Sequence, residues 1–145
     1  MGRQIERAAG RVSENAVAMA NETLRDLCLT QPETMVHGDL HFNNILRGVR
    51  EPWQVIDPKG CAGDPAYDVI TLLRTTAMYL LGGEDLESAL DRWIGIFADA
   101  AGLDRGHVQR WAQVRAVVVA QRSLENDRKP QWVRDINIRL VELLT

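Results

Sequence analysis

Two segments rich in turn-forming residues, 37–44 and 58–65, lie near the middle of this chain and constrain its fold most strongly. The first reads HGDLHFNN and the second reads PKGCAGDP, so both favour loops over helix or strand. Between them, residues 44–47 and 52–57 have the pattern of two short strands, with turn residues at 48–51. The centre of the chain is therefore predicted to be a β-hairpin between two loops.

Outside this centre, apolar residues recur at the spacing of amphipathic helices. Ser13 is placed to cap one helix at its start, Pro65 suits the first turn of another, and Gly102 suits a helix end. The expected fold is mostly α with a small β-hairpin. Helices are expected over residues 2–9, 13–28, 66–81, 84–101, 104–125 and 130–144.

Composition narrows the class of protein. The 145 residues suit a single domain or one lobe of a larger enzyme, and we expect one domain over residues 1–145. The net charge of −3 and the scattered basic residues disfavour nucleic-acid binding. No apolar stretch resembles a signal peptide or reaches membrane-spanning length, which predicts a cytoplasmic protein without membrane contact. Cys28 and Cys61 are expected to be buried or free thiols in a reducing compartment.

Three oxygen-bearing side chains, those of Asp39, Asn44 and Asp57, stand where strand-like segments meet loops. A hairpin between Asn44 and Asp57 would bring all three together. Magnesium prefers oxygen ligands such as carboxylates, and phosphoryl transfer depends mainly on positioning and charge neutralisation. We therefore expect Asn44 and Asp57 to hold Mg²⁺, and Asp39 to accept or orient the proton of an attacking hydroxyl.

A different interpretation uses the triplet His37, Asp39 and His41 as a metal site. Histidine and aspartate in such spacing occur in metal-dependent hydrolases. This alternative gives Asn44 and Asp57 no role, whereas phosphoryl transfer uses both.

Residues 37–46 resemble the catalytic loop of aminoglycoside phosphotransferases and their protein-kinase-like relatives, and Asp57 resembles the magnesium-binding aspartate of that family. Residues 53–68 are most similar to the streptomycin 6-phosphotransferase and hydroxyurea phosphotransferase branch. The resemblance implies the C-terminal lobe of a protein-kinase-like fold. It also implies an antibiotic-resistance enzyme that transfers a phosphoryl group from ATP to a hydroxyl of an aminoglycoside such as streptomycin, or of a similar small molecule.

The same resemblance implies a role for each matching residue. Asp39 would be the catalytic base, and His37 would brace the catalytic loop through hydrogen bonds. Asn44 and Asp57 would bind Mg²⁺ and, through it, ATP. Asp68 would fasten the catalytic loop from the helix that follows, whereas Asp64 is expected to cap that helix.

The chain departs from the family pattern before His37. We recognise neither a glycine-rich phosphate loop nor a lysine in residues 1–36, so an N-terminal nucleotide-binding lobe is expected to be absent. A second hypothesis follows, in which the chain is a truncated, non-catalytic helical module that binds a partner. A homodimer or a separate N-terminal lobe would then cover the surface that such a lobe normally meets.

Overall fold

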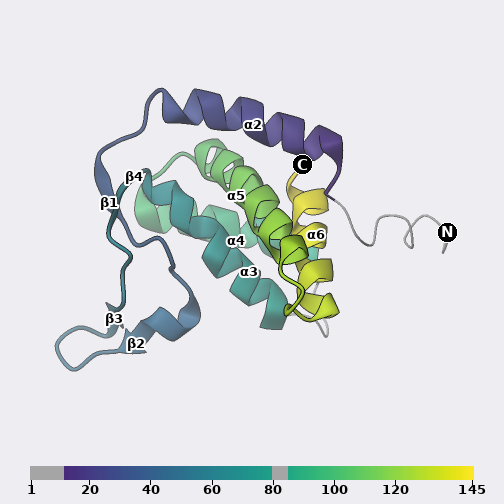
Figure 1. The fold of residues 1–145 in the computed structure, drawn as a ribbon. Helices are drawn as coiled ribbons and strands as arrows, with labels where there is room; N and C mark the ends of the chain where they lie inside the picture. The colour runs from purple at the N-terminus through teal and green to yellow at the C-terminus, as the bar shows by residue number, and fades with distance from the viewer. Residues whose placement is uncertain (1–11, 80–84) are drawn as a thin grey trace.

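The computed structural model describes residues 12–79 and 85–145, and it shows a body of helices with two short strand pairs at one side (Figure 1). This arrangement confirms the expectation of a mostly helical chain with little β-structure. The described residues also form two single turns of 3-10 helix, η1 (Phe42–Asn44) and η2 (Pro65–Asp68). The described helices are α2 (Glu14–Cys28), α3 (Val69–Tyr79), α4 (Leu86–Ala101), α5 (Arg105–Glu125) and α6 (Gln131–Leu144).

The helix ends follow the capping residues in the sequence. The Ser13 hydroxyl accepts a hydrogen bond from the Ala16 amide at 3.1 Å, which satisfies a free N–H of the first turn of α2. Gly102 ends α4 in the left-handed region, with φ +65°. The helix expected over residues 2–9, and the end of the helix expected over residues 66–81, lie outside the described residues.

The start of α3 differs slightly from the expectation. Pro65 opens the 3-10 turn η2, and the α-helix begins only at Val69. The Asp64 carboxylate accepts a hydrogen bond from the Ala66 amide at 2.9 Å, so Asp64 caps this turn as predicted. Its second oxygen lies 2.5 Å from His107 Nε2, which ties the turn to α5.

The strands form two separate antiparallel pairs. In the predicted hairpin, β2 (Ile45–Arg47) pairs with β3 (Trp53–Val55), and Leu46 lies opposite Gln54. The second pair was not expected, because β4 (Cys61–Gly63) lies in a segment predicted to be a loop; it pairs with β1 (Thr34–Val36). A strand of cysteine, alanine and glycine has little intrinsic β-propensity, so tertiary contact with β1 decides its conformation.

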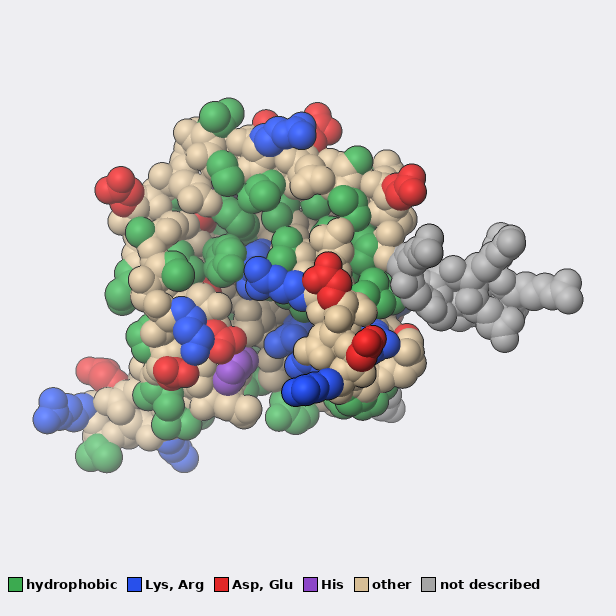
Figure 2. All heavy atoms as spheres, viewed as in Figure 1, with side chains coloured by type: hydrophobic (Ala, Val, Ile, Leu, Met, Phe, Trp, Pro, Cys, Tyr) green, Lys and Arg blue, Asp and Glu red, His purple; other side chains and the backbone are tan. Residues whose placement is uncertain are grey.

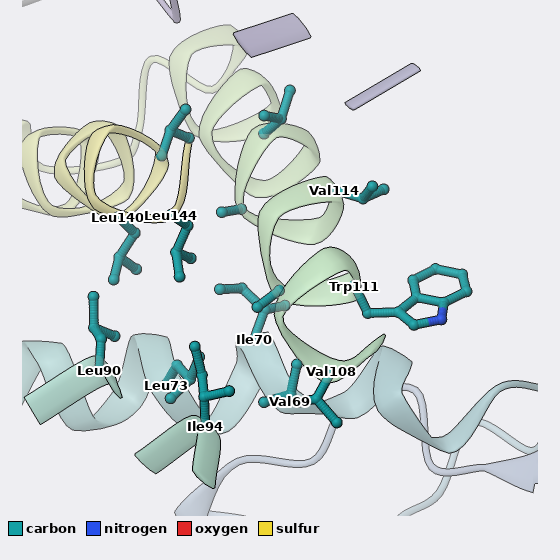
Figure 3. Packing of buried hydrophobic residues seen from close by; sticks show 14 of the residues in the cluster. Val69, Ile70, Leu73, Leu90, Ile94, Val108, Trp111, Val114, Leu140 and Leu144 are labelled. Carbon is teal, nitrogen blue, oxygen red and sulfur yellow. The ribbon is translucent and has the colours of Figure 1, made fainter. Parts of the chain in front are cut away.

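Helix α5 lies at the centre of the body and contacts α2, α3, α4 and α6. Its buried residues occur on all sides, as expected of a helix that is surrounded. Figure 3 shows Ile70 of α3, Ile94 of α4 and Leu140 of α6 pointing toward one another beside it. The Trp111 ring points away from this group and packs edge-on against Tyr67, with ring centroids 5.8 Å apart.

Two smaller findings concern the class of protein. Among the described residues, no helix is both long enough and apolar enough to span a membrane. Cys28 and Cys61 were expected to be either buried or free thiols. Both are free thiols, and both are exposed.

Candidate active site

The loop after β1 is held in place by one buried carboxylate. Asp68, at the end of η2, is only 6% exposed and accepts two hydrogen bonds of 2.8 Å, from the His37 amide to Oδ2 and from the Gly38 amide to Oδ1. Hydrogen bonds to an ionised acceptor are the stronger kind. Asp68 therefore fastens the predicted catalytic loop, although it does so from the turn before α3 and not from the helix itself.

The imidazole of His37 links this loop to the end of the hairpin. Its Nδ1 accepts a hydrogen bond from the Asp39 amide at 3.2 Å. Its Nε2 lies 2.8 Å from the Ile56 carbonyl oxygen, which can only accept, so Nε2 bears the proton and donates. His37 thus joins the loop after β1 to the residue that precedes Asp57.

The same two bonds argue against the alternative metal site at His37, Asp39 and His41. Both ring nitrogens of His37 are already engaged, so neither has a free lone pair for a metal. His41 Nε2 lies 3.7 Å from Asp39 Oδ2. Within residues 12–79 and 85–145, no group of three or more histidine, cysteine, aspartate or glutamate side chains could hold a metal ion. The structure thus gives the hydrolase interpretation no support.

Asn44 is joined to the loop and to the hairpin at once. Its side-chain Nδ2 donates a hydrogen bond to the backbone carbonyl oxygen of Asp39 at 3.0 Å. Its backbone carbonyl oxygen accepts a hydrogen bond from the Ile56 amide at 2.9 Å. Because a carbonyl oxygen can only accept, the amide group of Asn44 must present its nitrogen to Asp39, and its Oδ1 lies on the other side. Asn44 is largely buried, which fixes that orientation.

Asp57 follows Ile56 in an unusual backbone conformation. Its φ is +56°, and it is the only described residue other than glycine with a positive φ. Aspartate tolerates this left-handed region better than most residues, and such conformations gather at functional sites. The Asp57 side chain is 69% exposed, so its carboxylate faces solvent at the end of the hairpin.

One further side chain, that of Lys59, links two of the predicted residues, Asp39 and Asp57. Its Nζ lies 3.4 Å from Asp57 Oδ2 and 3.9 Å from Asp39 Oδ2. Figure 2 shows acidic, basic and histidine side chains close together beside the projecting hairpin. The sequence interpretation gave Lys59 no role.

A buried cation lies behind Asp68. Arg115 of α5 is 8% exposed, and its guanidinium stands 3.8 Å from the centre of the Tyr67 ring. Burial lowers the pKa of Arg115, and attraction to Tyr67 and to the Asp68 carboxylate opposes that shift. The positive charge of Arg115 on α5 thus attracts the Asp68 carboxylate.

The donor set suits a magnesium ion better than zinc. Asp57 offers an exposed carboxylate, and Asn44 offers an amide oxygen, both hard oxygen ligands of the kind that Mg²⁺ takes. The chain also places a cation of its own, the Lys59 ammonium, against Asp57 and Asp39. The site thus places one positive charge of the chain beside two carboxylates.

Comparison with known proteins finds similar sequences of one family. A family model described as aminoglycoside/hydroxyurea antibiotic resistance kinase matches residues 1–127. A hydroxyurea phosphotransferase of Kitasatospora aureofaciens is 34% identical over 120 residues, covering 78% of this chain and 32% of the relative.

Two streptomycin 6-kinases are also similar. That of Streptomyces glaucescens is 32% identical over 94 residues, covering 65% of this chain and 31% of the relative. That of Streptomyces griseus is 32% identical over 83 residues, covering 57% of this chain and 27% of the relative. This chain thus spans about a third of the length of the curated relatives that it matches. No solved structure matches it significantly.

Proposed function

The chain belongs to the aminoglycoside/hydroxyurea antibiotic resistance kinase family, and from this membership we propose that it forms the part of an ATP-dependent phosphotransferase that handles the acceptor hydroxyl and the metal. In this proposal it corresponds to the C-terminal lobe of a protein-kinase-like fold. The proposed acceptor is a hydroxyl of an aminoglycoside such as streptomycin, or of a similar small molecule. The observation that supports it most is the position of Asp39, which is joined to Asn44 by a hydrogen bond and to Asp57 through the Lys59 ammonium.

In the proposed reaction, Asp39 accepts the proton of the acceptor hydroxyl. The hydroxyl oxygen forms a bond to the γ-phosphorus of ATP, the bond to the β-phosphate oxygen breaks, and ADP leaves. The backbone of Asp39 is positioned for this role by Asn44 Nδ2 and by the ring of His37, while its carboxylate remains 37% exposed and can reach a substrate.

Asn44 and Asp57 are the proposed magnesium ligands. When bound, the ion would offset the negative charge of the phosphate oxygens. The left-handed backbone of Asp57 and the hydrogen bond between Ile56 and Asn44 hold the two residues at the same end of the hairpin. The two proposed ligands therefore flank the hairpin, Asn44 just before β2 and Asp57 just after β3.

The proposal is tested by assaying phosphorylation of streptomycin and of hydroxyurea with Mg²⁺ and ATP. Asp39→Asn keeps the shape of the side chain and removes the base, so we expect the rate to fall about 10²–10⁴-fold with little change in nucleotide affinity. Asp135→Asn is the matched control, because Asp135 is an exposed acid on α6. Full activity in Asp39→Asn would contradict the assignment of the base.

One observation favours a second candidate function, that of a partner-binding module. The hairpin projects from the body and exposes apolar side chains, with Trp53 65% and Val55 54% exposed (Figure 1). Exposed apolar surface often marks association, either with a second copy or with a nucleotide-binding partner chain. Titration with ATP and Mg²⁺ separates the two functions: no binding at millimolar ATP favours the module, whereas binding and turnover contradict it.

A further inference from the structure

The proposed reaction leaves Lys59 without a task, although its ammonium group lies against both carboxylates of the site. Lysine is rare in this chain, which has only Lys59 and Lys129. The distances of 3.4 Å to Asp57 and 3.9 Å to Asp39 place one positive charge beside two negative ones.

The backbone fixes Lys59 beside the catalytic loop. Its amide donates a hydrogen bond to the His37 carbonyl oxygen at 2.7 Å, just after the turn at Asp57. Its side chain passes close to Gly38: a Cβ added at Gly38 would lie 3.1 Å from Lys59 Cβ. Gly38 also has φ +83°, which glycine adopts without strain. The loop thus keeps a side-chain-free path along which Lys59 reaches the carboxylates.

Resting on the proposed function, we propose that Lys59 is a positioning residue that holds the Asp39 and Asp57 carboxylates side by side in the metal-free site, and that it competes with the divalent cation for them. Two carboxylates that face one another repel, and a cation close to both offsets that repulsion. Mg²⁺ seeks the same oxygens of Asp57. The Lys59 ammonium therefore performs in the metal-free site the neutralising task that the metal performs later.

This proposal fixes the sign of a measurable effect. If Lys59 merely supported the local structure, its replacement would weaken metal binding. If Lys59 competes with the metal for the carboxylates, its replacement will strengthen metal binding. One unit charge about 4 Å from a divalent ion in a water-like medium changes a binding constant about thirtyfold, because the interaction is twice that of two unit charges.

The experiment measures Mn²⁺ binding, as a probe for the magnesium site, by electron paramagnetic resonance of the free ion in the presence of the 145-residue chain. We expect Lys59→Met to bind Mn²⁺ about thirtyfold more tightly than wild type, and Lys59→Gln to do the same. Lys59→Arg keeps the charge and should remain near wild type. Lys129→Met is the matched control, because it removes the same charge from the exposed turn between α5 and α6.

A second variant separates the two proposals. Asp57→Asn should weaken Mn²⁺ binding in every background; if it does not, the metal site of the proposed function is wrong. If Asp57→Asn weakens binding but Lys59→Met binds no more tightly than Lys129→Met, the role of Lys59 is wrong and the proposed function stands. Absence of Mn²⁺ binding in wild type and in all Lys59 variants would overturn both. Lys59 is 53% exposed, so the fold should survive its replacement, and circular dichroism checks this.

Discussion

In the helical body, Ile70 and Leu140 are each only 1% exposed, whereas every residue from 51 to 62 is exposed to solvent. The body is held by apolar packing around α5. The strand-bearing segment buries few apolar side chains of its own. Hydrogen bonds that the Asp68 carboxylate accepts, and others made by the side chains of His37 and Asn44, hold it in place. The comparison shows how a small chain can keep carboxylates accessible and still position them: the Asp68 anchor is buried, whereas the Asp39 and Asp57 carboxylates are exposed.

The largest effect should come from the body. Ile70→Ala removes a fully buried side chain from α3, where it meets α4 and α6, and leaves a cavity. We expect the free energy of unfolding to fall by about 4 kcal/mol, measured by urea denaturation. The control is Ile96→Ala on α4, because Ile96 is 49% exposed and its loss should cost much less. Equal losses at the two positions would contradict the packing of the body.

A smaller and more local effect should come from the anchor. Asp68→Asn keeps the shape of the side chain but leaves it one oxygen that can accept a hydrogen bond, where the carboxylate had two. The backbone amide of either His37 or Gly38 therefore loses its acceptor. We expect a loss of about 2 kcal/mol, with faster amide hydrogen exchange at His37 and Gly38.

The helices should keep their slow amide exchange in this variant. Asp135→Asn on α6 serves as the control, since Asp135 is exposed and accepts a hydrogen bond only from the neighbouring Gln131 side chain. If Asp68→Asn speeds exchange in α3 and α5 as much as in the loop, then the body and the strand-bearing segment do not depend on separate interactions.

The smallest effect compares two glycines of the exposed segment. Gly38 and Gly60 both have positive φ, but only Gly38 has a close neighbour, Lys59 Cβ at 3.1 Å, and Gly60 has nothing within 4 Å. Gly60→Ala should therefore cost about 1 kcal/mol from backbone strain alone, and Gly38→Ala about 2 kcal/mol because crowding adds to it. Thermal unfolding of both variants measures the difference. Equal costs would show that Lys59 can move away from Gly38 freely.

Much of the local structure could be predicted from the sequence. Ser13 as an N-cap, Gly102 as a helix end and the hairpin around residues 48–51 each depend on interactions between near neighbours. The participation of Asp68 as an anchor was predicted from family resemblance, but not its two amide partners. The pairing of β4 with β1 was missed, because nothing in residues 61–63 favours a strand until β1 lies beside them.

The sequence by itself determined the helices, the hairpin and the set of oxygen-bearing side chains, because caps, turns and periodicity act over a few residues. Only the tertiary structure decided how those side chains meet. It placed Asp68 under the amides of residues far earlier in the chain, gave Asp57 its left-handed backbone, and set the Lys59 ammonium against two carboxylates. These features depend on contacts between distant segments, and packing around α5 brings those segments together.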